Sequence, residues 1–228
     1  MEEISKVKSI TLWIFIIPFF SLNACLVLIT QFHSLFPNSE DIITNTIPYF
    51  DGQVSISRTA RVFPTYLIFK PAMFLTSYLL IKYWIYNKNM ISNLDPENKN
   101  LKKILFFGIG SAVLLTLHSI FLGIKFDIAL YKLFRKLVIL FFVIFEIVAQ
   151  AYLVINLYKL KYKIIKLINI NFLKMKAILV STLIIVAIIS IPIISFPGHN
   201  FYKHALEWNF FVGVIAFYLL TFFMWKKR

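Results

Sequence analysis

Apolar residues in this chain gather into six long runs, and more polar segments separate each run from the next. A helix needs about 20 mostly apolar residues to cross the hydrocarbon core of a bilayer, and each run reaches that length. We therefore predict an all-α fold, a polytopic membrane protein whose bundle of about six transmembrane helices forms one domain over residues 1–228. The predicted spans are residues 10–31, 64–86, 104–124, 133–156, 177–196 and 205–225.

The lengths of the runs and connectors refine this prediction. The first run is too long for the core of a signal peptide, and no small-residue cleavage site follows it, so we expect a retained helix. The third and fourth runs are joined by a tight segment around residues 125–127, which predicts a helical hairpin. A Lys-rich connector joins the fourth run to the fifth.

The composition excludes an ordinary soluble domain. Hydrophobic residues make up 60% of the chain and charged residues only 15%, whereas a soluble domain carries roughly a quarter charged residues and under half apolar ones. The net charge of +14 comes from residues between the apolar runs rather than on an amphipathic surface. We therefore expect a membrane protein and no nucleic-acid partner.

The distribution of positive charge predicts the orientation in the membrane. Sixteen of the 24 Lys and Arg residues fall on the side that holds both termini, and eight fall on the other side. Because cytoplasmic loops carry an excess of Lys and Arg, we predict that both termini are cytoplasmic. The membrane itself stays open between a plasma or inner membrane and the Golgi or endoplasmic reticulum.

The basic residues of the minority side have two interpretations. Residues 132–136 hold three of them within about one and a half turns of helix. They can mark the interfacial start of the fourth span and reach the headgroups along their aliphatic stems. Alternatively, they form an anion site for a phosphate-bearing ligand. The candidates for such a site are Arg58, Arg61, Lys132, Arg135 and Lys136.

Polar residues inside the predicted spans are costly and usually face the protein interior or a cavity. Most of them fall in the outer half, which predicts a polar chamber that opens toward the extracytoplasmic leaflet, whereas the inner half beyond Gln150 reads as apolar. Glu146 and Gln150 stand four residues apart and so share one helix face. A carboxylate near mid-membrane must be protonated or paired, so we expect Glu146 to pair with Lys70 or His118. The intramembrane polar candidates are Asn23, Lys70, His118, Glu146 and Gln150.

No metal site or cofactor is expected. Cys25 is the single cysteine, and the four histidines lack the spacing of a helix-borne metal site. A Gly-rich phosphate loop is also missing, since only Gly108 and Gly110 lie close together and both fall inside an apolar run.

Two segments resemble a known family. Residues 47–61 read Ile-Pro-Tyr-Phe-Asp-Gly-Gln-Val-Ser-Ile-Ser-Arg-Thr-Ala-Arg, and residues 196–209 contain His199-Asn200 followed by Leu206-Glu207-Trp208. These segments are similar to the first luminal loop and to the entry of the last helix in the post-GPI-attachment lipid-remodelling factors. That family belongs to the FRAG/DRAM/Sfk superfamily, which also includes the N-terminal part of the Cwh cell-wall proteins. One departure is that Asp127 and Tyr131 stand where the family often has a histidine after the third span.

The resemblance implies a six-helix bundle that handles lipid, as in the acyl-chain remodelling of GPI anchors. A phosphoinositol-like or phospholipid headgroup would then lie at the outer leaflet. The implied headgroup site adds Ser55, His199, Asn200 and Glu207 to the five basic residues above.

Three functions stay open. The first is lipid handling, with membrane lipid as the partner. A catalytic form would take its base from His199 or His204 acting with Glu207, and whether the chain is an enzyme is undecided. The second is a small proton- or ion-coupled transporter that uses Glu146, His118 and Lys70 as a relay. The third is a non-catalytic subunit that binds another membrane protein through its aromatic helix surfaces.

Overall fold

Long helices dominate the architecture. The computed structural model describes residues 2–124, 128–195 and 198–226. In these ranges the long helices are α1 (Glu2–Gln31), α3 (Tyr66–Leu94), α4 (Leu101–Phe121), α5 (Ala129–Lys159), α7 (Ile170–Ser195) and α8 (Asn200–Met224). The short ones are η1 (His33–Leu35), η2 (Ser39–Asp41), α2 (Ile56–Arg61) and α6 (Lys161–Ile164).

The predicted all-α fold class is confirmed, and each predicted span falls on a long helix. Within the described residues, five helices are long and apolar enough to cross a membrane: α1, α4, α5, α7 and α8. The chain is therefore a multi-pass integral membrane protein. The second predicted span, residues 64–86, falls on α3, which is equally long but carries Lys70, Lys82 and Lys88. The predicted tight turn at residues 125–127 and the end of the fifth span at residue 196 lie outside the described residues.

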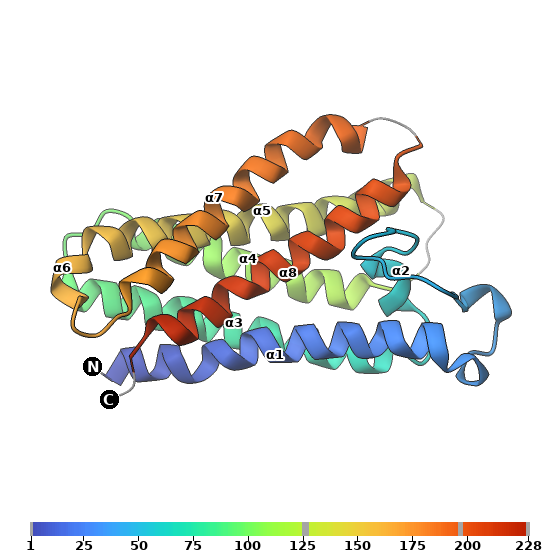
Figure 1. The fold of residues 1–228 in the computed structure, drawn as a ribbon, viewed down its shortest axis with the longest axis horizontal. Coiled ribbons are helices and arrows are strands. Elements are labelled where there is room, and N and C mark those ends of the chain that lie inside the picture. Colours follow the sequence, from blue (N-terminus) through green and yellow to red (C-terminus); the bar gives the residue numbers. More distant parts are fainter. Residues whose placement is uncertain (1, 125–127, 196–197, 227–228) are drawn as a thin grey trace.

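The six long helices form a closed ring. Helix α1 packs against α3, α3 against α4, α4 against α5, α5 against α7, α7 against α8, and α8 returns to α1. Both termini lie at the end of the bundle that also holds α6, whereas α2 lies at the opposite end (Figure 1). We call these the terminal end and the loop end.

Close packing of the ring depends on small residues where helices approach one another. At Gly108 of α4, an added Cβ would lie 2.3 Å from Cγ of Trp84 on α3. Trp84 is fully buried and meets Tyr83 edge-on, with ring centroids 5.0 Å apart. The missing side chain of Gly108 thus makes room for the largest side chain in this part of the core.

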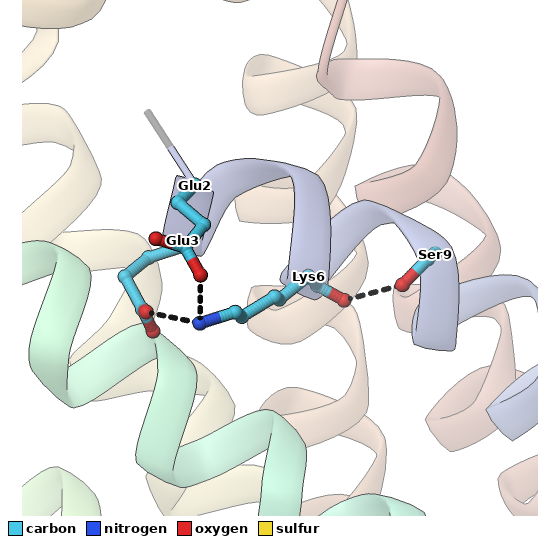
Figure 2. A network of polar contacts seen from close by, with 4 residues as sticks. All are labelled: Glu2, Glu3, Lys6 and Ser9. Carbon is cyan, nitrogen blue, oxygen red and sulfur yellow. Dashed lines mark hydrogen bonds and ion pairs between the residues drawn. The ribbon is translucent and has the colours of Figure 1, made fainter.

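The terminal end is fixed by polar contacts between distant segments. Trp225 forms an isolated antiparallel bridge with Ile168, and Lys8 donates to the Trp225 carbonyl. At the start of α1, Lys6 Nζ forms ion pairs with the carboxylates of Glu2 and Glu3, at 2.7 and 3.1 Å (Figure 2). Acidic residues in a first turn also complement the helix dipole. Since Glu2 is mostly exposed, these ion pairs add little to stability.

The packing at Gly108 yields a first prediction. Gly108→Val should lower the melting temperature in detergent, because overpacking a dense core costs about 1–3 kcal/mol. Val113→Ala, on an exposed part of the same helix, is the matched control and should melt close to wild type. Equal melting temperatures for Gly108→Val and wild type would contradict the tight α3–α4 approach.

Candidate functional site

A cavity of about 500 Å³ lies inside the ring. All six long helices line it, together with Ile56 of α2, and most of the lining is aliphatic or aromatic. Volumes of roughly 300–1,000 Å³ with a few polar groups are typical of small-molecule sites. The charged or titratable side chains in the lining are His118, Glu146, Lys203, Glu207 and Tyr218.

Glu146 forms the floor of the cavity on α5. It is fully buried, and its carboxylate accepts hydrogen bonds from Ser111 Oγ at 2.6 Å and from Gln150 Nε2 at 3.0 Å. The Tyr218 hydroxyl donates a third hydrogen bond. Gln150 also donates to the Val214 carbonyl. Donors from α4, α5 and α8 therefore converge on one carboxylate, which removes much of the penalty for burying it.

The mouth of the cavity lies toward the loop end. Glu207, in the second turn of α8, lines it, and its carboxylate interacts with the backbone N–H groups of Ile56 and Ser57 at the start of α2. His118 of α4 is almost fully buried and also faces the cavity, as does Lys203.

Two arginines approach each other beyond this mouth. Burial lowers the pKa of the Arg61 guanidinium, and repulsion from Arg135 and Arg58 lowers it further, while Asp41 partly opposes the shift. Arg135 stands four residues before Ile139, which lines the cavity, so both lie on one face of α5. Arg135 also acts electrostatically on His118, and its buried Nε has no hydrogen-bond partner within the described part of the chain. Basic side chains from α2 and α5 therefore lie close enough to repel one another near the mouth, where Asp41 offsets part of the repulsion on Arg61.

The two segments that carry the family resemblance contact each other. The His204 ring nitrogen Nδ1 lies 2.9 Å from the Gly52 carbonyl, and Trp208 Nε1 donates to the Val54 carbonyl at 2.9 Å. Asn209 donates to the Tyr49 carbonyl at 2.8 Å. The first turns of α8 therefore hold the loop of residues 42–55 across the loop end of the bundle.

Gly52 makes this docking possible. It has a positive φ of 60°, and an added Cβ would lie 1.8 Å from the Phe201 carbonyl oxygen. No side chain fits there, since the loop backbone lies directly on α8.

Asp51 stabilises the same loop from within. Its carboxylate accepts hydrogen bonds from Thr46 Oγ1, Ile47 N and Gln53 N at 2.7–3.0 Å. Desolvation alone would raise the pKa of Asp51, but the three hydrogen bonds outweigh it and the pKa lies below its ordinary value of 3.8. The ionised form therefore holds the turn.

Part of the predicted site is brought together. His118, Glu146 and Glu207 all line the cavity, and Gln150 bonds to Glu146 as their shared helix face implied. The predicted pairing of Glu146 with Lys70 or His118 is wrong, because Ser111, Gln150 and Tyr218 occupy the carboxylate instead.

The remaining candidates lie outside the cavity. Lys70 turns away, with Nζ 3.4 Å from the Ile120 carbonyl. Asn23 accepts from the Tyr49 hydroxyl and so anchors the loop. Ser55 caps α2 by accepting from Arg58 N at 3.1 Å. The other candidates are exposed, at the starts of α5 and α8: Lys132, Lys136, His199 and Asn200.

Several residues escaped the sequence analysis. Tyr218 is buried against Glu146. The sequence could have placed it on the cavity face of α8, because that face repeats at helical spacing through Glu207, Phe211, Val214 and Tyr218. The expectation of an apolar inner half is also wrong. Tyr83, Asn87, Thr221 and Lys176 are buried there, in the half of the bundle nearer the terminal end.

The Glu146 network yields a second prediction. Glu146→Ala should lower the melting temperature strongly, because it strands buried donors that cost about 1–3 kcal/mol each. Glu146→Gln keeps an acceptor oxygen and should be milder. Glu97→Ala, at an exposed position, is the control, and a Glu146→Ala protein as stable as this control would contradict the network.

Asp51 yields a third prediction. A carboxyl whose folded pKa is lowered stabilises the fold above its ordinary pKa of 3.8 and loses that contribution as the pH falls through the folded pKa. Asp51→Asn should therefore melt slightly below wild type at pH 7, with a small difference because Asp51 is largely solvated. The gap should narrow as thermal unfolding is repeated toward acid. A gap that widens with acid would exclude the proposed role of the ionised carboxylate.

The chain was compared with protein families, curated proteins and solved structures. No family model, no curated protein and no solved structure matches it.

Proposed function

We propose that this chain binds a membrane lipid with a phosphate-bearing headgroup at the extracytoplasmic leaflet, with an acyl chain in the cavity. The observation that carries the proposal is an apolar cavity inside the ring with basic side chains gathered at its mouth. A phospholipid matches this arrangement, because its apolar acyl chains are joined to a negatively charged headgroup.

The lining of the cavity supports an acyl chain as the occupant. Its wall includes Leu140 and Ile144 of α5 and Ile191 of α7, whose side chains are 51%, 42% and 61% exposed. Residues that line a cavity and are also exposed mark an opening at the side of the ring, between α5 and α7. Nearer the terminal end, Ile147, Leu183 and Val214 pack together and close this opening.

The charges at the mouth support a phosphate group as the ligand. Arginine binds phosphate oxygens through two parallel hydrogen bonds. Arg61 and Arg135 come from different helices and repel each other, so an anion between them would relieve that repulsion. Lys203 and His118 add donors on the cavity side.

The charge balance of the whole chain supports the orientation. Sixteen Lys and Arg residues against eight favour a cytoplasmic terminal end. The loop end, with the cavity mouth, then faces the other leaflet. The resemblance to the lipid-remodelling factors agrees with this proposal but stays a prediction, as does the choice of membrane.

Binding is better supported than catalysis. His204 is engaged by the Gly52 carbonyl and Glu207 by the backbone of α2, which assigns both to docking the loop. His199, at the exposed start of α8, does not line the cavity. A catalytic role for these three residues stays a prediction.

A pair of lipids that differ only in phosphate tests the proposal. Wild-type protein should bind short-chain phosphatidic acid more tightly than the matched diacylglycerol in native mass spectrometry or calorimetry. The double variant Arg61→Gln/Arg135→Gln should lose that preference, by about tenfold or more in Kd, since hydrogen bonds to charged groups contribute about 1.5–3 kcal/mol. Ala187→Trp, which fills the cavity, should weaken both lipids.

The matched control removes two exposed charges from the other end of the bundle. Lys166→Gln/Lys174→Gln should bind both lipids like wild type. Equal binding of the two lipids by wild type, or an equal loss in both double variants, would overturn the proposed headgroup site.

A further inference from the structure

A second group of buried polar residues lies between the cavity floor and the terminal end. Lys176 of α7 is fully buried. Its Nζ donates to Thr221 Oγ1 at 2.7 Å and lies 3.9 Å from the centroid of the Phe217 ring. No ion pair of Lys176 with an acidic side chain is found among the residues that the structure describes. Burying an amine without a counter-ion is costly, so lysines in such positions usually have a function.

Hydroxyl groups bridge the space between Lys176 and Glu146. Tyr218 donates to Glu146, and its ring meets that of Tyr83 edge-on with centroids 4.9 Å apart. The Tyr83 hydroxyl is fully buried near Thr221 and near the Glu146 carboxylate, and it makes no direct hydrogen bond within the described part of the chain. It therefore stands between two hydrogen-bonded pairs, Glu146–Tyr218 and Lys176–Thr221.

These residues extend over much of the bundle. Glu146 lines the cavity and stands 13 residues before the end of α5, about 20 Å along the helix axis. Lys176 stands six residues after the start of α7, about 9 Å from the terminal end of that helix. Its long, flexible side chain can swing between Thr221 and that interface.

We infer that Glu146 and Lys176 are the two ends of a proton relay that joins the cavity to the terminal end of the bundle. Tyr218, Tyr83 and Thr221 carry the proton between them. This activity goes beyond lipid binding and does not depend on it.

The steps balance in protons. The Lys176 ammonium gives a proton to Thr221 Oγ1, and the Thr221 hydroxyl passes its own proton to Tyr83 after turning away from the Phe217 carbonyl, which it now bonds. Tyr83 passes a proton to Tyr218, and Tyr218 passes one to the Glu146 carboxylate. A neutral amine and a carboxylic acid result. The net buried charge is zero before and after, and the transfer neutralises both end groups. Glu146 then releases its proton to the cavity and Lys176 takes up another at the terminal end, which restores the starting charges.

The surroundings of the two end groups contain few competing charges. Glu146 is faced by Ser111 from α4, Gln150 from its own helix, and Tyr218 and Tyr83 from α8 and α3. Lys176 is faced by Thr221. Among the side chains that the structure places in hydrogen-bond contact with Glu146 or Lys176, Tyr218 is the titratable one, and it belongs to the relay.

Proton flux into liposomes tests the inference. The full chain is reconstituted into liposomes that enclose a pH-sensitive dye, and the external solution is then made more acidic than the lumen. Wild type should acidify the lumen faster than protein-free liposomes do. Tyr83→Phe, Glu146→Gln and Lys176→Met should each reduce the rate to that of protein-free liposomes.

The choice of variants separates transport from folding. Tyr83→Phe removes an oxygen that makes no direct hydrogen bond, so it should keep the melting temperature and lose the flux. Lys174→Met, two residues from Lys176 and exposed, should keep the flux. A wild-type rate equal to that of protein-free liposomes would overturn the relay, and so would unchanged flux in Tyr83→Phe. Neither result would bear on lipid binding, which the Arg61 and Arg135 variants test separately.

Discussion

The Glu146 carboxylate is the group around which the bundle is organised. A charge or a carboxylic acid at this depth is tolerated only if several donors surround it. Ser111, Gln150 and Tyr218 supply them from three helices. This arrangement fixes how α4, α5 and α8 face one another. It therefore also fixes which of their side chains line the cavity toward the loop end and which fill the core toward the terminal end.

The structure of the loop end depends on a different constraint, which is how closely the backbone of the loop can approach the backbone of α8. Gly52 allows the loop of residues 42–55 to lie on the first turns of α8. Once the loop is docked, α2 follows directly after it and Arg61 comes near Arg135 of α5. The proximity of Arg61 to Arg135 therefore depends on how the loop packs as well as on the local sequence around either arginine.

The helices could be predicted from the sequence, because a run of about 20 apolar residues is a local signal. The Glu146–Gln150 hydrogen bond could also be predicted, because residues four apart share one helix face. The direction in which a residue points around its helix could not, because it depends on packing against neighbours that one sequence does not identify. Lys70 near the start of α3 and His118 near the end of α4 lie toward the same end of the bundle, yet Lys70 faces away from the cavity that His118 lines.

Lys176 falls in the connector predicted between the spans of residues 133–156 and 177–196 for a related reason. Lysines at the ends of apolar runs usually lie at the interface, and only the start of α7 at Ile170 puts this one inside a helix. Tyr83, Tyr218 and Thr221 read as ordinary residues of apolar spans until the ring brings them beside the two ionisable groups. The closed order of helices is thus the information that a single sequence lacks.

The side opening between α5 and α7 has a consequence for any ligand of the cavity. A lipid that enters by this route would arrive through hydrocarbon, so its mole fraction in the surrounding leaflet, rather than its concentration in water, would set how often the cavity is filled. Two amphiphiles with equal affinity for the lining would then be ranked by their abundance among neighbouring lipids, and the protein would sample membrane composition directly.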